Sequence, residues 1–230
     1  MSPYTISVEQ NHALSEQEKS EKIAAITLQL AQTAMKLART YRVPRYDTES
    51  RESDSEHTVM VALHSAQIAA QFFPDLNPYE VAYKALIHEL IETVTGDVQT
   101  FNISDDALHK KEQTEKNALE TLCSQLPEFT AHMVRIYEDH NDKASRFVGM
   151  TDKTAPVAVD ILGPGSMFMQ EDYDTNTLDD LQRIHAQLRQ RYDQRYPEPE
   201  LRLLHIAQEK LMVQFKHVFE PATSIQEVLF

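Results

Sequence analysis

Apolar residues recur at helical spacing along most of this chain of 230 residues. In residues 21–40 they return every three or four positions, which predicts an amphipathic helix. A second helix is expected after a cap at Asp54 or Ser55, through HTVMVALHSAQIAAQFF. A third begins at Asn77-Pro78 and continues to Gly96, because proline is favoured in a first turn and glycine just after a last one.

The same spacing predicts helices in the rest of the chain. One starts near Asp105, and Pro127 separates it from another through TAHMVRIYEDH. A further helix, kinked or restarted near Pro156, covers KASRFVGMTDKTAPVAVDIL, and two amphipathic helices follow in residues 178–219. The charged stretch YRVPRYDTESRESDSE is predicted to be a long loop, and loops of that length usually carry function.

Glycine is scarce, with 4 residues against 10 prolines, which argues against a turn-rich β protein and against a glycine-rich phosphate loop. The predicted fold class is therefore all-α. Two of the four glycines lie in LGPGS, which is the best candidate boundary. We predict a core domain over residues 1–165 and a C-terminal helical extension over 166–230 that packs on it.

The net charge of −14 comes from 22 Lys and Arg against 36 Asp and Glu. Such a molecule repels polymeric nucleic acid and anionic membrane surfaces, although a metal ion and an arginine can still attract a small phosphate ester. No apolar run reaches the about 18 residues of a membrane span, and the polar start has no signal-peptide core. We expect a cytoplasmic protein with no membrane contact. The single Cys123 excludes an internal disulfide.

Several ionisable side chains fall on predicted apolar faces, where they are costly to bury unless paired. His57 shares its face with Val61 and Ile68, and Asp152 has small or apolar helical neighbours. Lys153 is expected to be a poor partner for Asp152, because consecutive helical residues diverge by about 100°. One divalent cation would resolve these costs together, with ligands from His57, His88, Glu89 and Asp152. Alternatively, the two glutamates of HELIE face solvent and His57 is a hydrogen-bonded core residue.

The sequence segments around these residues resemble the HD-domain metal-dependent phosphohydrolases, and they are most similar to the 5′-deoxynucleotidase branch of that family. ESDSEH at 52–57 resembles the branch's E-x-x-x-E-H, and HELIETVTGD at 88–97 resembles its H-D-x-x-E-x-x-x-G-D. RVP at 42–44 stands where that branch has Arg-Trp-Pro, and RFVGMTDK at 146–153 resembles its closing aspartate segment. The similarity covers residues 40–165.

The resemblance implies an all-α HD-domain bundle, here with additional C-terminal helices, that hydrolyses a nucleotide or related phosphate monoester with a metal-activated water. It implies one divalent metal ion (Mn, Co, Fe, Mg or Zn) on His57, His88, Glu89 and Asp152. Glu92 would be the acid/base carboxylate, Asp97 would orient the substrate and Arg42 would bind the phosphate. Lys153, beside the fourth ligand, could also reach a phosphate. We expect small-molecule substrates and a homodimer.

Two residues depart from the family pattern. Glu89 stands where the family has the aspartate of its His-Asp pair, so the identity of the metal is left open. Val43 replaces the tryptophan that packs on the sugar. Selection of deoxyribose over ribose is therefore left open too. Two alternatives are kept. One is a dinuclear-iron oxygenase that recruits His109, His132 or His140, and the other is a degenerate HD module that only binds or regulates. Retention of Arg42, Glu92 and Asp97 argues against the second.

Overall fold

The computed structural model describes residues 14–163, 165–175, 177–196 and 198–214, and it is mostly helical in these ranges. The predicted all-α class is confirmed. Within the described residues, the sheet structure is one short antiparallel pair. In chain order the elements are α2 (Glu16–Leu37), β1 (Tyr41–Arg45), β2 (Arg51–Ser53), α3 (Asp54–Phe72), α4 (Pro78–Ile87), α5 (Glu92–Thr95), α6 (Asp105–Ser124), α7 (Glu128–Asp139), α8 (Lys143–Asp152), α9 (Ala155–Leu162), α10 (Gly165–Tyr173), α11 (Leu178–Arg195), the 3-10 helix η1 (Pro199–Leu201) and α12 (Arg202–Gln214).

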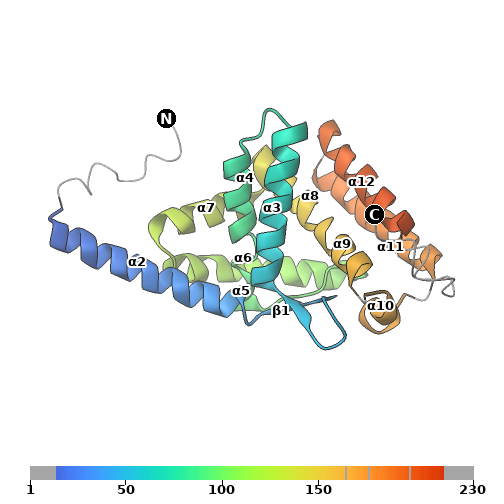
Figure 1. Cartoon of the computed structure of the whole chain (residues 1–230), viewed down its shortest axis with the longest axis horizontal. Helices are drawn as coiled ribbons and strands as arrows, with labels where there is room; N and C mark the ends of the chain where they lie inside the picture. The colour runs from blue at the N-terminus through green and yellow to red at the C-terminus, as the bar shows by residue number, and fades with distance from the viewer. Residues whose placement is uncertain (1–13, 164, 176, 197, 215–230) are drawn as a thin grey trace.

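The centre of the molecule is formed by α3, α4 and α8, which pack on one another (Figure 1). Their apolar positions recur at helical spacing and meet in a buried core that includes Val61, Val81, Phe147 and Val148. The ring of Phe147 packs on Phe73 with centroids 4.9 Å apart. Each fully buried side chain of this size stabilises the fold by about 1.5–3 kcal/mol. This core fixes the helices that carry the candidate site.

The segment predicted as a long loop is instead a β-hairpin. β1 pairs with β2 antiparallel, with Tyr41 opposite Ser53 and Arg45 opposite Arg51. The connecting turn is closed by Asp47, whose Oδ1 accepts hydrogen bonds from the backbone N–H groups of residues 49 and 50 at 2.8 and 2.6 Å. The cap of α3 is also corrected. It is Ser53, whose hydroxyl and backbone form a capping box with the third helical residue.

The helix predicted from Asn77 to Gly96 is divided in two. Asn77 caps α4 as expected, but α4 ends at Ile87, and residues 88–91 form tight turns before α5. Gly96 ends α5 with a positive φ of 77°, a backbone conformation that favours glycine. The division changes the site, because His88 and the residue after it lie in a turn and not on a continuous helix.

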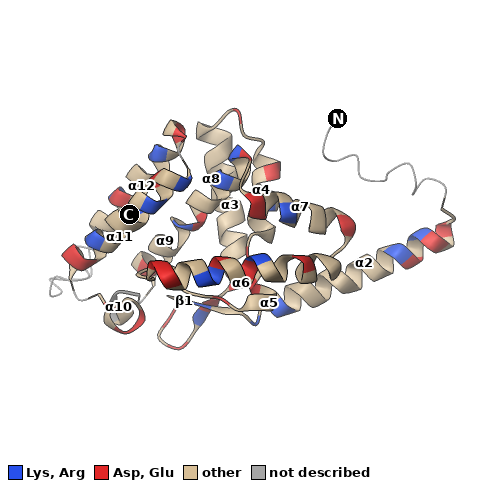
Figure 2. Cartoon of the chain, turned by 180° about the vertical axis from the view of Figure 1, so that it is seen from behind, with Lys and Arg blue, Asp and Glu red and all other residues tan. Residues whose placement is uncertain are grey.

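The outer elements lie on opposite sides of the core. α2 runs away from the body on one side, whereas α11 and α12 lie side by side on the other (Figure 1). Figure 2 shows that the charged residues of α2 gather near its two ends. α11 is joined to α6 by Arg191, which donates to Asp105 Oδ1 at 2.6 Å. α12 contacts α9 and the turn before it, where Gln208 donates to Thr154 Oγ1 at 3.0 Å.

None of the described helices combines the length and apolarity that crossing a membrane requires. The last part of the final predicted helix, residues 215–219, lies outside the described residues. The domain boundary at residue 165 stays a prediction.

Candidate metal centre

The four predicted metal ligands come together in one buried cluster. His57 lies in the first turn of α3, His88 and Glu89 follow α4, and Asp152 is the last residue of α8. One ligand atom from each lies within 4.8 Å of the others. His57 Nε2 is 2.8 Å from Asp152 Oδ1 and 3.6 Å from Glu89 Oε1. The segments that the sequence places far apart therefore converge on one point.

The state of His88 shows that this cluster fits a metal ion. Its Nδ1 is 2.6 Å from the backbone oxygen of Ala85, so Nδ1 carries a proton and Nε2 is the ring atom that faces the cluster. Nε2 is buried and has no hydrogen-bond partner among the described residues, while Glu89 Oε1 and Asp152 Oδ1 lie 3.4 and 3.6 Å away. Two imidazoles and two carboxylates form an ordinary donor set for Mn, Fe, Co or Zn.

Arg42 supplies the positive charge nearest to this cluster. It projects from β1, and its Nη1 forms an ion pair with Glu89 Oε1, while its Nε lies 3.5 Å from Glu52 Oε2 and Nη1 3.8 Å from Asp97 Oδ1. Burial opposes the charge of the guanidinium, but the surrounding carboxylates, Glu89 first, outweigh burial and raise the pKa of Arg42. The same arginine holds the pKa of Glu89 well below its usual range against the effect of burial.

Glu92 begins α5 beside the cluster and is 4% exposed. Burial, followed by the charge of Glu89, raises the pKa of Glu92 to about 7. Lys111 of α6 opposes this shift, because its Nζ donates to Glu92 Oε1 at 2.8 Å. A carboxyl group that titrates near neutrality is suited to carrying a proton. Burial also raises the pKa of the predicted orienting residue Asp97.

The prediction for Lys153 is wrong in one respect. Its Nζ lies 2.7 Å from Asp152 Oδ2, so it is a close partner of that carboxylate. α8 ends at Asp152, and the long side chain of the C-cap residue Lys153 folds back from outside the helix. Burial alone would raise the pKa of Asp152, but Lys153 and the two histidines hold it well below its usual range.

The cluster opens on a cavity that is also lined by the other predicted site residues. His88, Glu89 and Asp152 line it, and so do the predicted substrate and proton-transfer residues Arg42, Val43, Glu92, Asp97 and Lys153. Another wall comes from α9, α10 and α11, whose lining side chains are mostly apolar. Sequence reasoning missed two kinds of residue here. One is Lys111, which stands in a charged run typical of a solvated face, and the other is this apolar wall.

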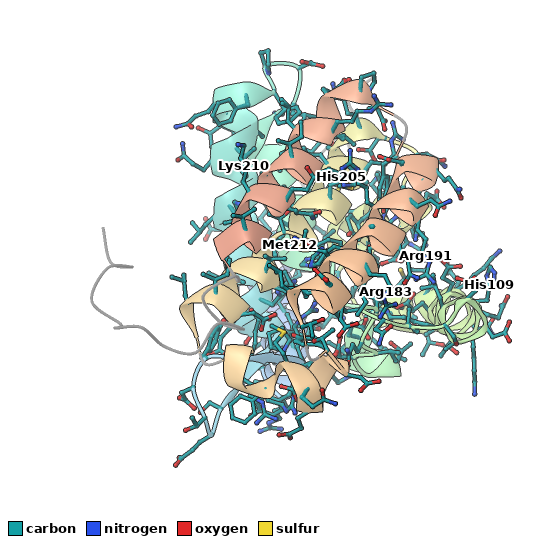
Figure 3. The ribbon with its side chains drawn as sticks, turned by 90° about the vertical axis from the view of Figure 1, so that its right-hand side faces the viewer. His109, Arg183, Arg191, His205, Lys210 and Met212 are labelled. Carbon is teal, nitrogen blue, oxygen red and sulfur yellow. The ribbon has the colours of Figure 1, made fainter. Side chains whose placement is uncertain are left out.

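The three histidines proposed for a second metal do not join the cluster. The side chain of His109 is 80% exposed at the outer side of α6 (Figure 3). His132 is half-buried in α7 and does not line the cavity. His140 does line it, but its ring packs between Tyr137 and Tyr196. Among the described residues, the group able to hold a metal contains no other histidine than His57 and His88.

Comparisons with known proteins agree with this architecture. The sequence model of the family described as HD domain matches residues 34–192. A search of curated protein sequences gave no match. Among solved structures, the chain is similar to a predicted metal-dependent phosphohydrolase from Magnetospirillum magnetotacticum MS-1, with a TM-score of 0.58 and 20% sequence identity. The match covers 82% of this chain and 93% of that chain, and at this identity it shows a shared fold.

Proposed function

Because this chain belongs to the HD domain family, we propose that it is a metal-dependent phosphohydrolase that cleaves a nucleotide or a related phosphate monoester. One observation carries the proposal. The buried group of His57, His88, Glu89 and Asp152 opens on a cavity that also holds Arg42. Metal ligands and a phosphate-binding cation are thus within reach of one small substrate.

The positive groups of the cavity explain how a protein of net charge −14 can bind an anion. The planar guanidinium of Arg42 can donate two parallel hydrogen bonds to phosphate oxygens, and Lys153 adds a point charge. A divalent ion on the four ligands would polarise a phosphoryl oxygen and lower the pKa of a water molecule. Asp97, 3.8 Å from Arg42, orients the arginine and the substrate's hydroxyl groups in this proposal.

Glu92 moves the protons. As the oxygen of the attacking water bonds to phosphorus, Glu92 accepts a water proton, and the bond from phosphorus to the ester oxygen breaks. The leaving alcohol oxygen then takes a proton from Glu92. A pKa of about 7 lets the carboxyl group act in both directions near neutral pH. Lys111 positions it, since its ammonium group holds one carboxylate oxygen at 2.8 Å.

The finer parts of the hypothesis stay predictions. These are the identity of the metal, a single ion per chain, a homodimer and a cytoplasmic location. Membership of the 5′-deoxynucleotidase branch is also a prediction, and Val43 in place of tryptophan removes the aromatic contact on which that branch's sugar selection would rest.

Elemental analysis of protein purified without chelator tests the proposal. We expect about one equivalent of metal per chain, lost in His57→Ala and Glu89→Ala and kept in the exposed control His109→Ala. With that metal, the wild type should hydrolyse p-nitrophenyl phosphate. About two iron ions per chain would favour the oxygenase. If the protein binds no metal after soaking in Mn, Co or Fe, the phosphohydrolase proposal fails. The degenerate HD module that only binds or regulates then remains.

A further inference from the structure

The wall of the cavity that α9, α10 and α11 contribute belongs to a second apolar core. A separate cluster of buried residues, Val157, Met169, Tyr173, Leu181 and Met212, lies between α9, α10, α11 and α12. Val43 of the hairpin and Phe101 of the loop between α5 and α6 pack against this cluster. Most of these side chains also line the cavity. The part of a ligand that lies here is therefore shielded from water and meets apolar surface.

Asp160 is the carboxylic acid of this apolar wall. It lies on α9, lines the cavity and is 7% exposed. Tyr173 donates its hydroxyl to Asp160 Oδ2 at 3.2 Å, and no Lys, Arg or His of the described chain forms an ion pair with the carboxyl. Burial raises the pKa of Asp160 to about 8, and the charges of Glu52 and Asp172 act in the same direction. Burial therefore favours the neutral, protonated form of this carboxyl group.

A neutral carboxyl group in this apolar wall can form more hydrogen bonds than the protein provides. It presents a hydrogen-bond donor and an acceptor side by side, and one tyrosine hydroxyl occupies only part of that capacity. A buried polar group whose hydrogen-bonding capacity is only partly used costs free energy. A ligand that supplies a matching acceptor and donor would remove this cost.

Aromatic rings beside Asp160 favour a planar ligand. Phe101 meets Tyr173 edge-on with centroids 5.1 Å apart, and His185 edge-on at 5.3 Å. Burial lowers the pKa of His185 to about 4, so all three rings are uncharged at neutral pH. Uncharged aromatic surface packs well on a flat, neutral ring.

We propose that Asp160, together with Tyr173, is a specificity-determining residue that recognises the polar edge of a nucleobase, so that the substrate is a nucleotide held at its base as well as its phosphate. The inference rests on the proposed function and deepens it. Every common nucleobase has an N–H group next to an acceptor atom on a planar ring, which matches a neutral carboxyl group. A sugar phosphate lacks the flat face, and an alkyl phosphate lacks the polar edge.

Binding, measured by calorimetry on the full chain loaded with its metal, tests this assignment. The ligands are nucleoside 5′-monophosphates, with ribose 5-phosphate as the reference that has a phosphate and sugar but no base. We expect at least one nucleotide to bind about tenfold or more tightly than ribose 5-phosphate. This preference should fall by about tenfold in Asp160→Leu, because a site built around a hydrogen bond discriminates strongly. It should persist in Asp160→Asn, whose amide also presents a donor beside an acceptor.

The exposed variant Asp179→Asn, on the first turn of α11, is the matched control and should keep the preference. Equal binding of nucleotides and ribose 5-phosphate by the wild type would overturn the assignment, as would an unchanged preference in Asp160→Leu. Hydrolysis of p-nitrophenyl phosphate, measured on the same samples, reports the proposed function separately. If no ester is cleaved while base-dependent binding still needs Asp160, the phosphohydrolase fails and the nucleotide site stands.

Discussion

The Nζ of Lys84 in α4 donates a hydrogen bond at 2.5 Å to Oδ1 of Asp142, the N-cap residue of α8. Lys84 is 1% exposed, and Glu80 adds a second contact at 3.0 Å. The pair joins the helix that precedes His88 to the helix that ends at Asp152. A buried lysine that does not line the cavity thus connects two of the elements that carry candidate metal ligands.

Replacing this lysine should destabilise the fold. Lys84→Met removes the buried ammonium group and leaves Asp142 without that partner, but the aspartate is half-exposed and can be hydrated. We therefore expect a loss of about 2 kcal/mol in the free energy of unfolding, less than for a fully buried pair. Urea titration measures it. Lys143→Met is the control, because its partners Asp75 and Glu200 are exposed and it should cost under about 1 kcal/mol. Equal losses in both variants would contradict the prediction.

Arg42→Lys should impair turnover while leaving the metal in place. A lysine cannot make the paired hydrogen bonds that the guanidinium offers to a phosphate, so kcat/KM for a phosphate ester is expected to fall by about 100-fold. Steady-state kinetics and elemental analysis of the same sample separate the two effects. Arg183→Lys on α11, where the side chain is 58% exposed (Figure 3), is the control. Activity within about threefold of wild type in Arg42→Lys would mean that the arginine only balances charge.

Asp160 should make stability depend on pH. Its folded-state pKa of about 8 lies above the ordinary value of 3.8, so the folded state binds the proton more tightly. Its contribution is fully present below pH 3.8 and is lost as the pH rises through 8. The free energy of unfolding of the wild type minus that of Asp160→Asn should thus fall between pH 5 and pH 8, by on the order of a few kcal/mol. Parallel pH curves would show that the carboxyl is already ionised.

Gly163→Ala should strain the contact between α9 and the hairpin. A methyl group there would lie 2.6 Å from the backbone oxygen of Arg45 and 3.0 Å from that of Val159. Backbone atoms cannot move away easily, so we expect a loss of about 1–3 kcal/mol. Thermal unfolding measures this loss of stability. Gly96→Ala is the comparison, because its methyl group would meet nothing within 4 Å and only its positive φ adds a cost. A smaller loss at Gly163 than at Gly96 would be inconsistent with the steric explanation.

Helical periodicity was sufficient to predict most of the helices, but not the hairpin. Its strands contain Pro44 and several charged residues and show no alternation of apolar and polar positions. They are held instead by distant contacts, since Arg45 and Arg51 both donate to Asp172 of α10. The end of α4 was missed for a related reason. The apolar pattern continues past Ile87, whereas the backbone turns so that His88 and Glu89 can reach the cluster.

The candidate ligands were predictable because buried imidazoles and carboxylates need a positive partner, and the resemblance supplied their order. Lys111 was not predictable, because the charged run around it is typical of a solvated face, and only the fold brings it to Glu92. Asp160 had a local signal that was overlooked. APVAVDIL places one carboxyl group in an otherwise apolar helix.

The anchoring of the hairpin to α10 also orders the assembly of the protein. The candidate metal ligands are contained in residues 57–152, whereas Asp172 lies 127 residues beyond Arg45 and 121 beyond Arg51. Chains are synthesised from the N-terminus, and contacts of such long sequence separation form late because loop closure is entropically costly. A growing chain therefore has all four candidate ligands before it has the anchor that holds the strand of Arg42. The wall that α9, α10 and α11 contribute is therefore the last part of the cavity to be built.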